Sequence, residues 1–205
     1  MQRILFQGDS ITDVGRSREV DRLSGSGYPT LIAAQLGYEA PGAYEFLNRG
    51  ISGNRISDLL ARIKVDIINL QPDVLSILIG VNDVWHEAAH QNGVHTALYE
   101  TLYDVLITEV KAALPEIRIL ILEPFVLRGS ATEAAFDEFS AEVPLRAAAA
   151  KRVAEKHGLE YIPLQEKFEA ACRLAPPEYW LADGVHPTPA GHELIARAWL
   201  EQFAR

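Results

Sequence analysis

Short apolar segments alternate with longer amphipathic ones along the whole chain. Five of the short segments are apolar at nearly every position, which is typical of strands buried within a parallel sheet: 4–6, 44–47, 74–79, 117–122 and 159–162. The segments between them carry helical patterns: 29–36, 56–70, 96–114, 143–157 and 189–203. Strands that alternate with helices of this length predict βαβ units with right-handed crossovers. The pattern therefore predicts an α/β fold, a three-layer α/β/α sandwich around a five-stranded parallel sheet.

The organisation of the chain is uniform from end to end. No segment rich in proline, glycine or serine divides it, and the alanine run at 147–150 fits a helix interior. We therefore expect a single domain over residues 1–205. In an open parallel sheet, ligands bind beyond the carboxyl ends of the strands. The polar residues that directly follow each apolar segment are accordingly the first candidates for a functional site.

Charge and cysteine content narrow the range of partners. The chain has 19 Lys and Arg against 28 Asp and Glu, a formal net charge of −9, and no run of basic residues that could follow a phosphate backbone. Nucleic acid and membranes are therefore not expected partners. Cys172 is the only cysteine, which excludes an intrachain disulfide and gives no sign of an oxidising compartment. The sequence turns polar after Phe6, too early for a signal peptide, so a cytoplasmic location is expected.

Candidate nucleophile and base residues lie at opposite ends of the chain. Ser10 follows the first predicted strand in Gly-Asp-Ser-Ile-Thr, where a tight strand-to-helix turn exposes a hydroxyl. A serine there is also a common helix N-cap, so the turn alone does not establish catalysis. Near the C-terminus, Asp183 and His186 are three residues apart, close enough for the carboxylate to orient the imidazole. An imidazole held in this way can take a proton from a serine hydroxyl.

Two further short segments carry N–H groups that can donate hydrogen bonds to a negative charge. With the Gly-Asp-Ser-Ile-Thr segment and the Asp183–His186 segment they make four blocks. Gly53 lies in a glycine-containing loop after the second strand, where the backbone can approach a ligand. Asn82 follows the third strand in Gly-Val-Asn-Asp, and its NH₂ group can donate to a developing oxyanion. Each residue also has a simpler interpretation as part of a turn. Together, however, the four blocks provide a nucleophile, an orienting acid, a base and oxyanion donors.

The four blocks resemble those of the SGNH or GDSL family of esterases, in the same order and over essentially the whole chain. The resemblance implies a flavodoxin-like sheet with the site at its carboxyl edge, and no cofactor or metal. It further implies that Ser10 is the nucleophile, His186 the general base and Asp183 its orienting partner. The implied oxyanion hole consists of the backbone N–H groups of Ser10 and Gly53 and the side chain of Asn82.

A narrower resemblance concerns the substrate. Ile11 replaces the leucine of GDSL, and the blocks look like those of bacterial SGNH acetylxylan esterases and related carbohydrate acetylesterases. The implied substrate is a small-molecule or oligosaccharide ester that loses an acetyl group. The resemblance is compatible with a homo-oligomer but does not fix the oligomeric state. A lipid esterase, a lysophospholipase or a thioesterase of the same fold is the alternative. Because no long insertion is available to form an apolar lid, we expect a preference for short acyl chains.

Three residues beside the blocks are candidates for substrate contacts. Trp85 and Trp180 flank the asparagine and Asp-His blocks, where an indole can form the wall of a sugar site or equally pack in the core. Asp9, which precedes the candidate nucleophile, is the third candidate substrate contact, although its expected role is to hold the loop.

A competing motif lies just after the asparagine block. His86, Glu87 and His90 form an H-E-x-x-H pattern, which on a helix can place two imidazoles on a zinc ion with the glutamate as general base. A zinc-dependent hydrolase is therefore one rival hypothesis, and a catalytically silent binding module is the other. The longer metzincin pattern is not met, because His95 follows Gly93 one residue too early for a third ligand. The simpler expectation places the three histidines on a polar rim near the mouth of the site.

Overall fold

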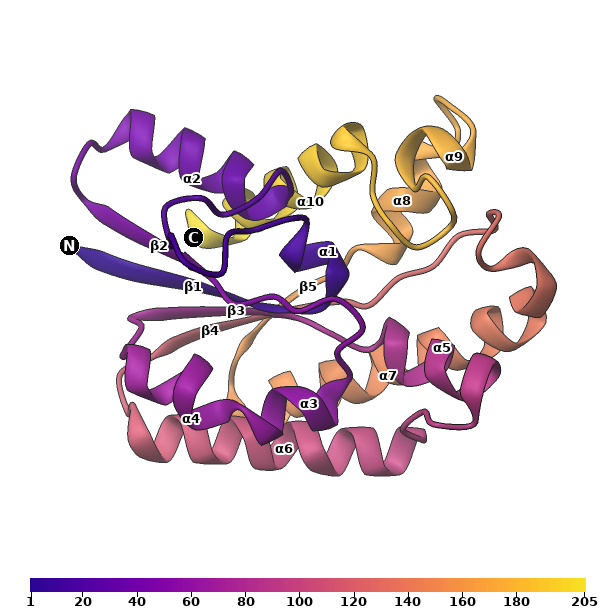
Figure 1. Ribbon diagram of the computed structural model, residues 1–205, viewed down its shortest axis with the longest axis horizontal. Helices are drawn as coiled ribbons and strands as arrows, with labels where there is room; N and C mark the ends of the chain where they lie inside the picture. The colour runs from indigo at the N-terminus through magenta and orange to yellow at the C-terminus, as the bar shows by residue number, and fades with distance from the viewer.

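The computed structural model describes all residues, 1–205, and has a central sheet of five strands (Figure 1). They are β1 (Gln2–Gly8), β2 (Tyr44–Asn48), β3 (Val74–Leu78), β4 (Arg118–Leu122) and β5 (Glu160–Ile162). Their order in the sheet is β2-β1-β3-β4-β5, and every neighbouring pair is parallel. The five predicted strands are confirmed, and no end is displaced by more than two residues. The order reverses between β1 and β3, which opens a crevice for ligands at their carboxyl ends.

Successive residues of the central strands face opposite sides of the sheet, which explains why these segments are apolar throughout. In β1, Ile4 and Phe6 pack into one hydrophobic core and Leu5 packs into the other. The same alternation holds in β4 for Leu120 and Ile121. All five side chains are fully buried. Two cores, one on each face of the sheet, fix its position within the molecule.

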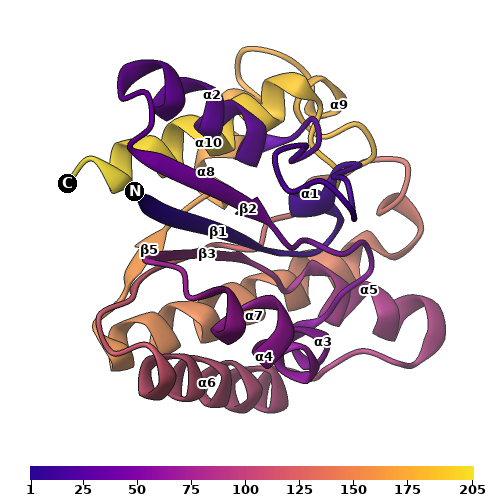
Figure 2. The same cartoon turned by 60° about the vertical axis from the view of Figure 1, so that its left-hand side comes forward.

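The helices form the two outer layers. One face carries α2 (Tyr28–Glu39), α8 (Gln165–Ala171) and α10 (Pro189–Phe203); the other carries α3 (Ile56–Ala61), α4 (Ile63–Asp66), α6 (Thr96–Ala113) and α7 (Phe136–His157) (Figures 1 and 2). The shorter helices α1 (Ser10–Asp13), α5 (Val81–His90) and α9 (Pro177–Trp180) lie toward the carboxyl end of the sheet (Figure 1). Two 3₁₀ turns are η1 (Ile68–Leu70) and η2 (Glu133–Ala135). The predicted three-layer sandwich is confirmed. None of these helices combines the length and apolar composition needed to cross a bilayer.

The predicted helix over 56–70 is broken into α3, α4 and η1. Arg62 separates the first two with a non-helical backbone (φ −109°, ψ 15°). Its guanidinium donates to the carbonyl of Arg49 (2.7 Å) and to Asn54 Oδ1 (2.9 Å), both in the loop that precedes α3. Hydrogen bonds with this loop therefore interrupt the single helix that the spacing of the apolar residues predicts.

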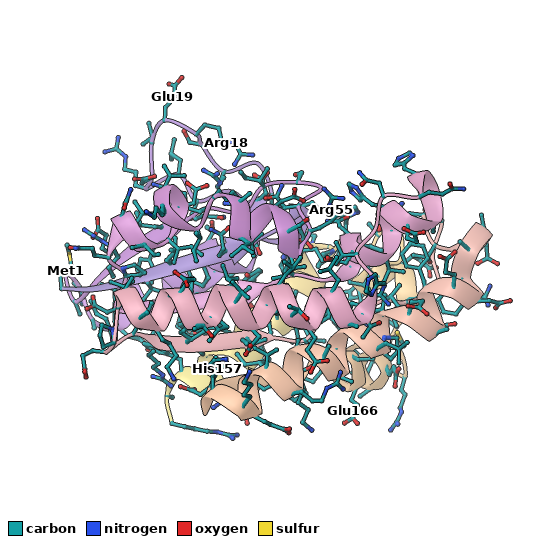
Figure 3. All side chains as sticks on the ribbon, turned by 90° about the horizontal axis from the view of Figure 1, so that it is seen from below. Met1, Arg18, Glu19, Arg55, His157 and Glu166 are labelled. Atoms are coloured by element: carbon teal, nitrogen blue, oxygen red, sulfur yellow. The ribbon has the colours of Figure 1, made fainter.

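Helix α7 is longer than the sequence pattern indicates. The predicted range of 143–157 places Pro144 in the first turn, where proline is favoured, but the helix begins at Phe136 and contains Pro144 in its interior. Its last residue, His157, is labelled in Figure 3. His157 Nε2 lies 2.7 Å from Asp104 Oδ1 of α6, so a polar contact joins the end of α7 to the middle of α6 in the same layer.

Candidate active site

Three polar side chains form a hydrogen-bonded chain at the carboxyl end of the sheet. Ser10 Oγ lies 2.9 Å from His186 Nε2, although the two residues are 176 positions apart in the sequence. His186 Nδ1 lies 2.7 Å from Asp183 Oδ2. An imidazole placed between a hydroxyl and a carboxylate can accept the hydroxyl proton on Nε2 while its Nδ1–H donates to the carboxylate. The structure therefore brings together the candidate nucleophile, base and orienting acid.

Ser10 is exposed to His186 because Asp9 takes over the capping of α1. Asp9 is the N-cap, and its Oδ1 accepts a hydrogen bond from the backbone N–H of Ile11 (3.0 Å). Ser10 is thus the first residue of the helix, and its hydroxyl is not needed as a cap. The simpler interpretation of Ser10 as an N-cap is wrong.

Asp183 is held in its orienting position by the loop that carries it. Its Oδ1 accepts hydrogen bonds from the backbone N–H groups of Val185 (2.9 Å) and His186 (2.8 Å), which leaves Oδ2 for the imidazole. Burial opposes ionisation, but these hydrogen bonds and that of the His186 ring outweigh it and hold the pKa of Asp183 below its ordinary value. Asp183 is therefore a carboxylate at neutral pH.

Three N–H donors belong to residues that line the pocket at Ser10. The backbone N–H groups of Ser10 and Gly53 have no acceptor within the protein. The side chain of Asn82 donates one hydrogen to the carbonyl of Asn54 (3.1 Å), and its second N–H is left for another acceptor. Ser10, Gly53 and Asn82 line the same pocket. Hydrogen-bond donors of this kind can stabilise negative charge that develops on an oxygen bound in such a pocket.

Two glycines give this donor set its shape. Gly53 has a φ of +81°, a left-handed conformation that side chains with a Cβ atom rarely adopt. Gly80, the residue before α5, has a φ of +138°, and a Cβ atom there would lie 3.0 Å from the hydroxyl of Tyr99. The first glycine turns its loop beside Ser10, and the second starts the helix that carries Asn82.

Two buried aspartates that sequence reasoning did not single out anchor the loops of the site. Asp13 Oδ2 accepts hydrogen bonds from the backbone N–H (3.0 Å) and the hydroxyl (3.1 Å) of Ser52, which also lines the pocket. Asp83 accepts from the backbone N–H of Ile56 at the start of α3 (3.2 Å). Asp13 directly follows the Gly-Asp-Ser-Ile-Thr block and Asp83 ends the Gly-Val-Asn-Asp block. Their role depends on contacts 39 and 27 positions away, which no local pattern shows.

The pocket at Ser10 is small, and most of its lining residues are polar. Its volume is about 240 Å³, and Trp85 is the only large apolar side chain in its lining. The remaining lining residues come from the four blocks and from the H-E-x-x-H segment: Ser10, Ser52, Gly53, Asn82, His86, His90 and His186. The pocket therefore offers little apolar surface for a long acyl chain.

The structure brings one of the three candidate substrate contacts to this pocket. Trp85 lines it, with its ring centroid 5.8 Å from that of His186. Trp180 does not, because its indole N–H donates to the carbonyl of Ala175 (3.2 Å) and the ring lines a separate groove between α8, α9 and α10. Asp9 is only 1% exposed, so its carboxylate lies beneath the loop and out of reach of a substrate. Its observed role is to cap α1, as expected of a residue that holds the loop.

The H-E-x-x-H segment is helical, but its glutamate lies apart from its histidines. Glu87 Oε2 accepts a hydrogen bond from the backbone N–H of Gly93 (2.9 Å), and Glu87 and His95 line a different pocket from that of His86 and His90. No three His, Cys, Asp or Glu side chains are grouped so that they could hold a metal ion. The expectation of a polar rim at the site therefore fits His86 and His90, whereas His95 lies elsewhere.

The buried Asp9 predicts a pH-dependent contribution to stability. Burial raises its pKa to about 7 in the folded protein, against the opposing effects of the Ile11 hydrogen bond and the His186 charge. The unfolded chain releases this proton near pH 4, so Asp9 makes the free energy of unfolding fall between about pH 4 and 7, by at most about 1.4 kcal/mol per pH unit. Asp9→Asn, which keeps a capping oxygen, should remove this component. We expect the stability of the variant relative to wild type to increase over that range in urea unfolding; a difference independent of pH would contradict the assignment.

Comparison with known proteins identifies the chain. Residues 6–194 match the GDSL-like lipase/acylhydrolase family. The chain belongs to this family. It is a carboxylic ester hydrolase, and the expected family, fold and enzyme class are confirmed.

Relatives match over nearly their whole length. The chain is 32% identical over 214 residues to an acetylxylan esterase from Geobacillus stearothermophilus, and the match covers 98% of this chain and 94% of that protein. A crystal structure of a GDSL-like lipase from Parabacteroides merdae is 40% identical with a TM-score of 0.94, covering 99% of this chain and 95% of the other. A catalytic mutant of the Geobacillus acetylxylan esterase has a TM-score of 0.89 at 30% identity, covering 100% and 94%.

Proposed function

We propose that this family member is a serine esterase that removes acetyl groups from a carbohydrate, such as an acetylated xylo-oligosaccharide, through an acyl-enzyme. The observation that carries the mechanism is the hydrogen-bonded chain of Ser10, His186 and Asp183 beside unsatisfied N–H donors. The relatives support these roles. Solved catalytic mutants of the Geobacillus enzyme replace a serine, an aspartate or a histidine by alanine, and there too the aspartate and histidine are three positions apart.

The first half of the reaction forms the acyl-enzyme. Ser10 Oγ attacks the ester carbonyl while its proton passes to His186 Nε2. The carbonyl oxygen becomes an oxyanion, which accepts hydrogen bonds from the N–H groups of Ser10 and Gly53 and from Asn82. Asp183 stabilises the imidazolium that forms. The C–O bond to the alcohol then breaks, and the alcohol leaves with the proton from His186.

The second half of the reaction uses water. His186, again neutral, removes a proton from a water molecule that attacks the acyl carbonyl. The same donors stabilise the second oxyanion, and the bond to Ser10 Oγ breaks as His186 returns the proton to it. The products are a carboxylic acid and the free enzyme, so no cofactor is required by the proposed steps.

The acyl group is proposed to be short because of the pocket. A pocket of about 240 Å³ with Trp85 as its one large apolar wall has room for an acetyl group but little apolar surface for a chain. An acyl chain left in water gains none of the roughly 0.8 kcal/mol available per buried CH₂. The kcat/KM for p-nitrophenyl acetate should therefore exceed that for the octanoate, measured below micelle-forming concentrations. A steady rise from acetate to octanoate would favour a lipid esterase or thioesterase instead.

The oxyanion role of Asn82 predicts a specific kinetic defect. Asn82→Ala removes one of three proposed donors and should lower kcat by about 100- to 1,000-fold with a smaller change in KM, since the lost hydrogen bond is strongest in the transition state. Circular dichroism serves as the control, because Asn82 also bonds the carbonyl of Asn54. Unchanged turnover in a folded variant would remove Asn82 from the oxyanion hole.

The carbohydrate part of the proposal rests on the acetylxylan esterase relative and on Trp85, an aromatic wall that a sugar ring can pack against. The direct test compares release of acetate from acetylated xylo-oligosaccharides with hydrolysis of simple acetyl esters. We expect the oligosaccharide to have the higher kcat/KM. Efficient hydrolysis of simple esters alone would keep the esterase mechanism and reject the carbohydrate substrate.

A further inference from the structure

The imidazoles of His86 and His90 have no hydrogen-bond or ion-pair partner in the protein. The other four of the six histidines are all engaged. Their partners are the backbone N–H of Leu98 for His95, Asp104 for His157, Ser10 and Asp183 for His186, and the backbone N–H of Tyr28 for His192. The two free imidazoles belong to the motif that the serine mechanism leaves unexplained.

The free imidazoles lie next to one another at the mouth of the pocket. They are four residues apart on α5, so they project from the same face of the helix one turn apart. Their ring centroids are 6.3 Å apart, and the ring planes are nearly perpendicular (88°). Both line the pocket that contains Ser10 and His186. His86 is half-buried and His90 exposed, so a ligand can reach both from solvent.

We propose that His86 and His90 bind a divalent transition-metal ion of the zinc class, and that the bound ion closes the mouth of the pocket and inhibits ester hydrolysis. Neutral imidazole nitrogens suit zinc, copper and nickel, whereas magnesium and calcium prefer oxygen ligands. With two protein ligands, water completes the coordination, and binding is reversible and weaker than at a structural zinc site.

The surrounding residues indicate inhibition rather than zinc catalysis. A zinc hydrolase of the H-E-x-x-H type needs its glutamate beside the metal-bound water. Glu87 is instead bonded to the backbone N–H of Gly93 and lines another pocket. His186 is engaged by Ser10 and Asp183. An ion on His86 and His90 would therefore lack a general base and would occupy space that the ester needs. This part of the inference rests on the proposed function, which places the ester in this pocket.

The test is a zinc titration of purified enzyme in a Cys172→Ser background, which removes the one thiol that could also bind zinc. The protein is treated with a chelator, dialysed and assayed with p-nitrophenyl acetate in a non-chelating buffer, with the reaction without enzyme subtracted at each zinc concentration. His86→Gln and His90→Gln are compared with the control His95→Gln, each relative to its own zinc-free activity. Isothermal titration calorimetry measures zinc binding independently of activity.

We expect zinc to inhibit the parent protein, with one ion bound per chain. His86→Gln and His90→Gln should each raise the half-inhibiting concentration at least 10-fold, since even loss of an outer-shell partner typically costs about 10- to 100-fold in metal affinity. His95→Gln should respond like the parent. Equal inhibition of all variants, or absence of calorimetric binding in the parent, would overturn the proposed site. Activity lost on chelation and restored by zinc would overturn the serine mechanism as well, so the two failures are distinguishable.

Discussion

Ser10→Ala should nearly abolish ester hydrolysis while the protein stays folded. The nucleophile, base and orienting acid act as one unit, and loss of the nucleophile typically lowers kcat by about 10⁴- to 10⁶-fold. Only the hydroxyl that bonds His186 is removed, since Asp9 rather than Ser10 caps α1. The measurement is kcat for p-nitrophenyl acetate together with the thermal melting curve.

A second serine in the same pocket provides the matched control. Ser52 lines the pocket, but its hydroxyl donates to Asp13 Oδ2 (3.1 Å) and makes no hydrogen bond with an imidazole. Ser52→Ala should therefore keep most of its turnover. If Ser52→Ala lost activity and Ser10→Ala retained it, the nucleophile would have been assigned to the wrong serine.

Asp183→Asn is expected to have the next largest effect, a loss of about 10⁴-fold in kcat. An amide at this position can keep accepting the backbone N–H bonds of Val185 and His186 through its oxygen. Its NH₂ group would then face His186 Nδ1 and favour the tautomer that carries a proton on Nε2, which cannot accept the serine proton.

The kinetic pattern separates this effect from a general disturbance of the site. KM should change little, because Asp183 does not line the pocket in which the ester is proposed to bind. A reduction in kcat of less than about tenfold would show that His186 does not need the carboxylate, given that the loss for a wrong tautomer is far larger.

The sheet was predictable because its central strands are apolar on both faces. Contacts with neighbouring loops do not change this pattern. The start of α10 was equally accessible, since Thr188 caps it and Pro189 occupies its first turn, both strong local preferences. The break at Arg62 was not predictable. It results from hydrogen bonds with Arg49 and Asn54, which depend on how the preceding loop folds back.

The candidate site, too, was predictable from the sequence only in part. The four blocks carry Ser10, Gly53, Asn82 and the Asp-His pair within short, recognisable spacings. Three of them directly follow predicted strands, which predicts that they lie together at the carboxyl edge of the sheet, whereas the Asp-His pair precedes the last helix. The surroundings depend on side-chain directions that spacing does not contain. Trp180 flanks the Asp-His block in sequence, but its indole turns to the carbonyl of Ala175 and away from the pocket.

The central claim, that Ser10 is the nucleophile of an acyl-enzyme, is tested most directly by covalent labelling. A fluorophosphonate ester reacts with an activated serine and loses fluoride as the O–P bond forms. After treatment, mass spectrometry of the peptides should locate one phosphonyl group per chain on Ser10, and the loss of activity should parallel the extent of labelling. Labelling of another residue with concurrent inactivation, or full activity in protein completely labelled at Ser10, would contradict the account.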